Sequence, residues 1–249
     1  MRKTLLVIGG GRGIGASVAL LAGKRGYDVA VSYRERADRA HEVVREIQRS
    51  GARSLALQAD VRDPTQVQRL FDETQASLGA LDALVIAAGV TGRASTLAEA
   101  SPQVLQETID VNVVGTLLCA REAVLRMARS RGGRGGGIVF ISSGAATLGS
   151  AGEFVWYAAS KGAIDSLTRG LAIEVACEGI RVNAVAPGLT LTELHEQSTG
   201  EAGRAARLAP TIPLGRAAMA EEIAEPILWL LSGAASYVTG TVLRATGGR

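Results

Sequence analysis

Cysteine is scarce in this sequence: Cys119 and Cys177 are the only two among 249 residues. Both stand in apolar stretches of helical character, and their spacing matches neither a disulfide framework nor a zinc site. The sequence therefore predicts no bound metal and no disulfide. We expect the protein to reside in a reducing, cytoplasmic compartment.

Long apolar runs and a strong charge excess are also missing. No run is long enough to cross a membrane, and the apolar stretch that follows Lys3 is too short for the core of a signal peptide. The net charge of +3 and the pI near 9.1 would suit an anionic small molecule but fall short of a nucleic-acid binder. The glycine- and arginine-rich segment 130–137 is interpreted as a flexible connection. We expect neither a membrane nor a nucleic acid as a partner.

Short β-rich apolar runs alternate with longer helical patterns along the whole chain. The runs are apolar on both faces, as in strands that helices cover from both sides of a parallel sheet. No long linker and no fixed-period repeat divides the chain. The pattern predicts an α/β protein with a single domain over 1–249, a doubly wound Rossmann fold with a seven-stranded parallel sheet. The expected strands cover 4–9, 28–33, 54–59, 83–88, 137–142, 181–186 and 241–245.

A glycine loop, "GGGRGIG" from Gly9 to Gly15, follows the first expected strand and precedes a helical pattern. Glycine permits a tight turn and a close approach of the backbone to a pyrophosphate, and a helix N-terminus supplies amide donors and a partial positive charge. This order of strand, loop and helix predicts a dinucleotide site rather than a plain turn.

The end of the second expected strand should distinguish NAD from NADP. An acidic residue there would bind the ribose 2′-hydroxyl, whereas a basic one would pair with a 2′-phosphate. Tyr33 occupies this place, Arg34 follows it, and Arg12 in the glycine loop can approach the same phosphate. NADP(H) is therefore favoured over NAD(H), although Glu35 lies near the usual spacing of the acidic residue. Asp60, after the third strand, is expected to accept from the adenine amino group. The competing role is a cap for the helix that starts at Pro64, which is expected of Asp63 more than of Asp60.

The segment "VWYAASKG" places Tyr157 one helical turn before Lys161, so the two side chains share a face of the helix. Such a pair is either an ordinary surface feature or an acid whose pKa is shifted by its neighbour. A free phenol has a pKa near 10 and is a poor proton donor at neutral pH. A neighbouring ammonium would stabilise the phenolate and lower that pKa.

These residues, taken together, resemble the short-chain dehydrogenases/reductases over nearly the whole chain. The glycine loop resembles the TGxxxGxG signature of the family, with Ile8 in place of the threonine, and "VNVVG", "ISSG" and "YAASK" resemble further motifs in the expected order. The resemblance implies a catalytic tetrad of Asn112, Ser143, Tyr157 and Lys161. Tyr157 would be the general acid/base.

The resemblance also assigns roles to the other members of the tetrad. Ser143 would donate to the substrate oxygen, Lys161 would hold the cofactor ribose, and Asn112 would hold a water for proton relay. The segment "NAVAPG" and the residues after it resemble the part that covers the nicotinamide. The residues expected to bind the cofactor are Gly9, Gly11, Arg12, Gly13, Ile14, Gly15, Tyr33, Arg34, Asp60, Val61, Ala88, Gly89, Tyr157, Lys161, Pro187, Gly188, Thr190 and Thr192.

The chain departs from the family pattern at three further positions. Ile86 and Ala87 replace the two asparagines of NNAG, and Arg244 stands where many relatives carry aspartate. A small-residue and polar stretch at about 188–212 is expected to form a substrate lid that includes His195. By resemblance, the protein is expected to be a homo-oligomer, with a tetramer as the common state.

The predicted function is that of an NADP(H)-dependent oxidoreductase transferring a hydride between the nicotinamide and a carbonyl or secondary alcohol. The substrate would be a small molecule or a carrier-bound carbonyl compound, since 3-oxoacyl-carrier-protein reductases and sugar dehydrogenases are similar members of the family. One alternative is an NAD-dependent alcohol or sugar dehydrogenase. Another is a non-catalytic protein that senses a dinucleotide or serves as a scaffold.

Overall fold

The protein is described by a computed structural model that covers residues 2–193, 199–201 and 203–249. A seven-stranded sheet with the strand order β3-β2-β1-β4-β5-β6-β7 forms its middle layer, and all neighbouring strands are parallel. All seven expected strands are present, with ends shifted by at most two residues. They are β1 (Lys3–Ile8), β2 (Tyr27–Tyr33), β3 (Ser54–Gln58), β4 (Leu81–Ile86), β5 (Gly136–Ile141), β6 (Ile180–Pro187) and β7 (Val242–Ala245).

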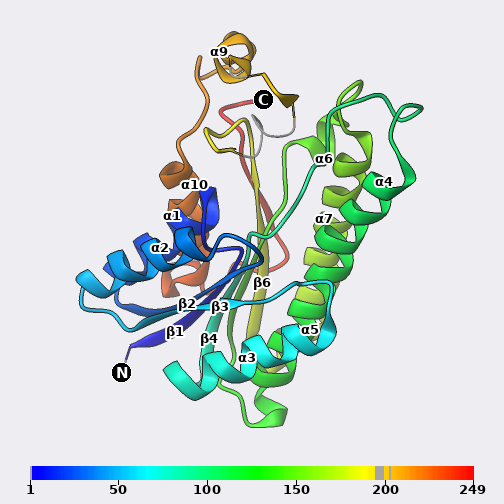
Figure 1. Cartoon of the computed structure of the whole chain (residues 1–249). Coiled ribbons are helices and arrows are strands. Elements are labelled where there is room, and N and C mark those ends of the chain that lie inside the picture. Colours follow the sequence, from blue (N-terminus) through cyan, green and yellow to red (C-terminus); the bar gives the residue numbers. More distant parts are fainter. Residues whose placement is uncertain (1, 194–198, 202) are drawn as a thin grey trace.

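Helices cover both faces of the sheet (Figure 1). One face packs against α1 (Gly13–Lys24), α2 (Ala37–Arg49) and α10 (Ala220–Leu231). The other packs against α3 (Pro64–Leu78), α5 (Gly115–Met127) and α7 (Val155–Val175), with α4 (Pro102–Ile109) and the π-helix η1 (Asp110–Val114) leading into α5. The short helices α6 (Ala145–Leu148) and α9 (Arg204–Leu208) lie beyond the carboxyl ends of the strands (Figure 1). The predicted doubly wound fold is confirmed.

Successive residues of β1 explain why the strands are apolar on both faces. Leu5 and Val7 belong to the core that packs under α1, α2 and α10, whereas Leu6 and Ile8 belong to the core on the opposite face. Side chains of a strand alternate between its faces, so a central strand covered on both sides has no solvated face. None of the helices in the described part of the chain combines the length and the apolar character that spanning a membrane requires.

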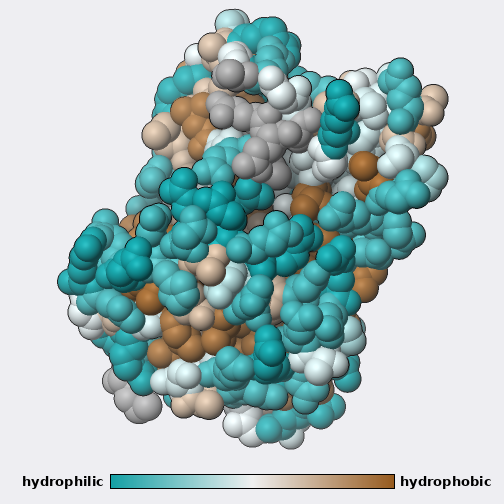
Figure 2. Space-filling model, in the orientation of Figure 1, coloured by the Kyte–Doolittle hydropathy of each residue, from teal (hydrophilic) through white to brown (hydrophobic). Residues whose placement is uncertain are grey.

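The strand order reverses between β1 and β4. In a doubly wound sheet, the loops that leave two such neighbouring strands diverge to opposite faces and open a crevice at the carboxyl edge. In this protein the glycine loop follows β1, and the segment that begins at Ala87 follows β4. Figure 2 shows that hydrophilic side chains cover most of the molecular face seen there, with a hydrophobic patch low on it between α2 and α3.

Candidate active site

Two positions of the glycine loop admit no side chain, because backbone atoms of the loop itself or of the segment after β4 lie too close. A Cβ atom at Gly15 would lie 2.2 Å from the carbonyl oxygen of Gly9, and a Cβ at Gly9 would lie 2.8 Å from the amide nitrogen of Ala88. Gly9 and Gly13 also have positive φ angles of 78° and 53°. The loop brings the N-terminus of α1 to the cavity described next, so that its free amides face an anionic ligand.

A cavity of about 480 Å³ lies at this crevice. The glycine loop, the ends of β2 and β3, the segment after β4, the end of β5, the first turns of α7 and the segment after β6 line it. Every residue that the sequence assigns to the cofactor lines this single cavity, and so does Ser143. Asn112 is the exception among the predicted site residues, since it lies behind the wall and is fully buried.

Sequence reasoning missed several residues of the cavity wall. Ser32 is the clearest case, because its Oγ accepts from the Gly9 amide at 3.1 Å and so fixes the start of the glycine loop. A polar residue inside an otherwise apolar strand is a signal that could have identified it. The others were not expected to line the site, although Ala87, Val111, Ile141 and Ser142 belong to motifs quoted above: Arg36, Ala59, Ala87, Val90, Val111, Ile141, Ser142 and Glu193.

The catalytic candidates of α7 are buried, with Tyr157 8% and Lys161 5% exposed. The Tyr157 hydroxyl hydrogen-bonds with Ser143, which follows β5. The Lys161 Nζ donates to the Ile141 carbonyl at 2.7 Å and lies 5.6 Å from the centroid of the Tyr157 ring. Three of the four predicted catalytic side chains therefore meet at the end of β5.

Opposing effects act on the pKa of Tyr157. Burial raises the pKa of the phenol, and the hydrogen bond with Ser143 acts to lower it. The Lys161 ammonium is turned toward the Ile141 carbonyl and lies over the face of the tyrosine ring. The net pKa of the phenol is therefore raised in this structure, and the expected tuning of the phenol by Lys161 stays a prediction. Burial also lowers the pKa of Lys161 to about 8, against the opposing effect of the Asp165 carboxylate.

Asn112 lies in η1 and ties that helix to the segment after β4. Its Oδ1 accepts from the Val90 amide at 2.8 Å, and its Nδ2 donates to the Val90 carbonyl at 2.8 Å and to the Ser160 Oγ at 3.0 Å. A Cβ at Gly89 would lie 3.3 Å from Asn112 Oδ1 and 3.5 Å from Lys161 Nζ. The side chain of Asn112 is thus an anchor for the cavity wall, and its expected role in holding a water for proton relay stays a prediction.

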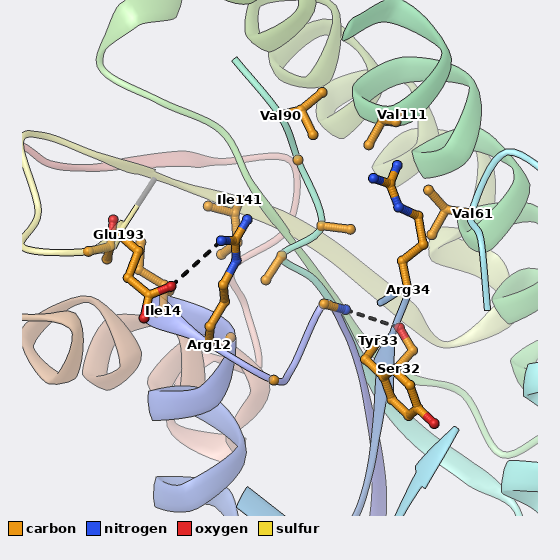
Figure 3. A pocket seen from close by; sticks show the side chains of 18 of the residues that line it. Arg12, Ile14, Ser32, Tyr33, Arg34, Val61, Val90, Val111, Ile141 and Glu193 are labelled. Carbon is orange, nitrogen blue, oxygen red and sulfur yellow. Dashed lines mark hydrogen bonds and ion pairs between the residues drawn. The ribbon is translucent and has the colours of Figure 1, made fainter. Parts of the chain in front are cut away.

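The two arginines expected at a 2′-phosphate line the cavity but do not converge on one point (Figure 3). Arg12 turns toward Glu193, with 3.7 Å between the charged atoms. Arg34 donates to Glu35 Oε1 at 2.9 and 2.5 Å and lies 3.7 Å from Glu107 of α4. Both guanidinium groups are partly exposed and both are paired with carboxylates. A bound phosphate would therefore have to compete with these exposed ion pairs.

Asp60 also has a partner within the chain. Both of its carboxylate oxygens accept from the Arg62 guanidinium, at 2.5 to 3.0 Å, and the hydrogen bonds to Arg62 lower the pKa of the carboxyl. Helix α3 is capped instead by Asp63, which accepts from the Thr65 and Gln66 amides at 2.8 and 3.2 Å. The capping alternative for Asp60 is therefore excluded, and its oxygens remain at the cavity.

The departures from the family pattern are accommodated without disrupting the site. Ile86 is buried in β4, and the Ala87 amide donates to the Ile8 carbonyl at 2.8 Å. Arg244 is exposed and donates to Thr147 Oγ1 at 2.5 Å and to the Arg249 carbonyl at 2.8 Å. His195 lies outside the described residues. Within the described ranges, no group of histidine, cysteine and acidic side chains could hold a metal ion.

The fold and the site together define a dinucleotide-binding oxidoreductase of the doubly wound class. A family model described as "Enoyl-(Acyl carrier protein) reductase" matches residues 9–249. The chain belongs to the short-chain dehydrogenase/reductase family.

The relatives agree with this membership over their full lengths. The chain is 48% identical over 244 residues to "Uncharacterized oxidoreductase YgfF" of Escherichia coli, which covers 98% of both chains. It is 36% identical over 248 residues to "3-oxoacyl-[acyl-carrier-protein] reductase FabG" of Staphylococcus aureus, covering 100% of this chain and 98% of the relative. A crystal structure of a short-chain dehydrogenase from Burkholderia cenocepacia in complex with NADP is similar with a TM-score of 0.90 and 33% identity, over 99% of this chain and 97% of that one.

Proposed function

We propose that this protein is an NADP(H)-dependent oxidoreductase that transfers a hydride between the nicotinamide and a carbonyl or secondary alcohol. The observation that carries the proposal is the shared cavity: Ser143, Tyr157 and Lys161 line the same space as the glycine loop. The loop fits a dinucleotide because its glycines leave the backbone bare beside the N-terminus of α1. When bound, a reduced nicotinamide would supply the hydride.

The side chains of the site then handle the proton and the developing charge. During reduction, the Tyr157 hydroxyl donates its proton to the carbonyl oxygen as the carbon accepts the hydride. The Ser143 hydroxyl, already hydrogen-bonded to Tyr157, donates to the same oxygen and stabilises the negative charge that develops on it. The buried Lys161 ammonium would supply positive charge next to the tyrosine and would hold the hydroxyls of the cofactor ribose. In the oxidation direction the same groups reverse their roles.

Cofactor choice depends on the rim of the cavity. Arg12 and Arg34 are the cationic side chains that would receive a 2′-phosphate, and the Burkholderia cenocepacia relative was solved with NADP. Glu35 also lines the cavity, so NAD(H) is the second candidate. The relatives named as reductases of carrier-bound oxoacyl groups support a carbonyl substrate that is small or carrier-bound.

Three further features belong to the same proposal. The expected lid over about 188–212 stays part of the proposal, since Gly188, Thr190 and Thr192 line the cavity; residues 194–198 and 202 lie outside the described part of the chain. A homo-oligomer, with a tetramer as the expected state, would cover the exposed apolar side chains of Val114, Leu117 and Ile173. The free cysteines suit a reducing cytoplasm.

A parallel titration of the purified protein with NADPH and NADH tests the proposal. Quenching of tryptophan emission reports binding, because Trp156 adjoins Tyr157 and is buried. Micromolar binding of NADPH with much weaker binding of NADH, followed by NADPH oxidation with a panel of ketones, aldehydes and 3-oxoacyl thioesters, supports it. Preference for NADH would reassign the cofactor, and binding without turnover by any member of the panel would favour a dinucleotide sensor.

A further inference from the structure

Three consecutive residues at the end of β5 pair with three residues of α7 that lie one turn apart. Tyr157, Lys161 and Asp165 follow each other at intervals of four residues and so share one face of α7. Tyr157 hydrogen-bonds with Ser143, and Lys161 donates to the Ile141 carbonyl at 2.7 Å. The Ser142 hydroxyl donates to Asp165 Oδ1 and completes the set. Asp165 thus extends the catalytic pair by one turn.

The contact between Ser142 and Asp165 is a built feature of the interior. Ser142 is only 1% exposed, and a buried hydroxyl needs an acceptor. An ionised carboxylate is a strong acceptor and forms a charge-assisted hydrogen bond. Ser142 stands between Ile141, which contacts Lys161, and Ser143, which contacts Tyr157. Its bond to Asp165 therefore fixes the end of β5 from which both contacts are made.

We propose that Asp165 is a positioning residue of the active site: anchored by Ser142, its carboxylate keeps the Lys161 ammonium charged and the strand end in register. The effect of Asp165 on turnover rests on the proposed function, whereas its effect on the charge of Lys161 does not. No residue of the predicted tetrad carries a negative charge, so the tetrad alone leaves the buried Lys161 ammonium without a counter-charge.

The charge on Lys161 needs such support. Burial lowers the pKa of the ammonium, and even with the opposing effect of Asp165 this pKa is about 8, near enough to neutral pH for part of the protein to lose the charge. The Asp165 carboxylate is the charged group that raises this pKa. Removing the negative charge of Asp165 takes away this effect, so the pKa of Lys161 would fall further.

Among the described residues, most charged side chains on the elements around α7 bind other partners, and some of these elements carry no charged side chain. In β6, Arg181 donates to the carbonyls of Leu230 and Val238 on the α10 side of the sheet. Glu107 of α4 pairs with Arg34, and Asp110 of η1 accepts from Gln106. Helix α6, with the sequence AATL, carries no charge, and Asn112 and Ser160 present neutral side chains. On α7 itself, Arg169 is exposed one turn beyond Asp165.

The decisive variant is Asp165→Asn, which keeps an acceptor for Ser142 and removes the charge. We expect the alkaline limb of the rate of NADPH-dependent carbonyl reduction to move by about one pH unit toward acid. Asp165→Glu should restore the wild-type profile. Glu174→Gln, which removes one exposed negative charge from the same helix, is the matched control and should leave the profile in place. A profile for Asp165→Asn that superimposes on the wild type would overturn the proposal.

A second readout does not depend on turnover. The free energy of unfolding of the cofactor-free protein, compared with that of Lys161→Met, reports the titration of Lys161. In the Asp165→Asn background, the pH at which this difference starts to rise should also fall by about one unit. A shift here with no turnover in the wild type would refute the proposed function and keep the role of Asp165. Turnover in the wild type with no shift in either readout would refute the role of Asp165 and keep the proposed function.

Discussion

The two ends of the cavity hold their polar side chains in different ways. At the catalytic end, Tyr157 and Lys161 are buried and contact the fixed end of β5. At the rim, Arg12 and Arg34 are partly exposed and pair with carboxylates on flexible side chains. Exposed ion pairs contribute about 0–1 kcal/mol each, so they can be exchanged for a phosphate at little loss. The chemistry is therefore preorganised, whereas recognition of the cofactor is left adjustable.

The largest effect should come from the catalytic end. Tyr157→Phe removes the proton donor and one donor to the developing oxyanion, and we expect turnover to fall by roughly 10³-fold or more. Affinity for NADPH should stay within about twofold, because the ring and its packing remain. Steady-state rates and fluorescence titration of the same preparation measure both. Near-native turnover in this variant would remove Tyr157 from the mechanism.

The glycine loop should give the next largest effect. In Gly15→Ala, the added Cβ would lie 2.2 Å from the Gly9 carbonyl oxygen, so the start of the loop and the first turn of α1 must move apart. We expect NADPH affinity to fall at least about tenfold and stability to fall by about 1–3 kcal/mol. Gly170→Ala in α7 is the matched control, because nothing lies within 4 Å of its Cβ position. Its stability should be unchanged or rise by up to about 1 kcal/mol. Equal behaviour of the two variants would refute the close packing of the loop.

The rim should affect binding without affecting chemistry. Arg34→Ala should weaken NADPH binding by roughly tenfold and leave NADH binding nearly unchanged. Loss of a charge-assisted hydrogen bond costs about 1.5–3 kcal/mol, and part of this loss is offset because the variant has no ion pair with Glu35 to break on binding. Arg39→Ala on α2, where an exposed arginine pairs with Glu42, is the control. The maximal rate at saturating NADPH should be retained. If NADPH and NADH affinities fall together, Arg34 does not read the 2′-phosphate.

The smallest effect concerns pH and the buried lysine. The pKa of Lys161 is about 8 in the folded protein and 10.5 as an ordinary value, so between these pH values the unfolded chain binds more protons. Stability must then rise with pH in this window, relative to Lys161→Met. We expect a gain on the order of 1 kcal/mol by about pH 9, measured by urea unfolding without cofactor. A difference that is flat with pH would show that Lys161 is not held in a desolvated site.

The sequence predicts most of the scaffold because strand patterns and the glycine loop are local features. The residues expected to bind cofactor all line one cavity, since parallel strands end at the same edge of the sheet. The contacts of Arg34 with Glu107 and of Ser142 with Asp165 could not be predicted, because they join segments 73 and 23 residues apart by tertiary packing. The orientation of Lys161 toward Ile141 likewise depends on how α7 is set against β5. Sequence periodicity identifies which residues share a helix face, but it does not identify the residues of other elements that this face contacts.

Side-by-side assay of Tyr157→Phe and Arg34→Ala for NADPH affinity and for carbonyl reduction tests the division of labour most directly. We predict a crossed result: Tyr157→Phe binds NADPH like the wild type and barely turns over, whereas Arg34→Ala binds weakly and turns over normally at saturation. Parallel losses of affinity and turnover in both variants would contradict a preorganised catalytic end with a separate, adjustable rim.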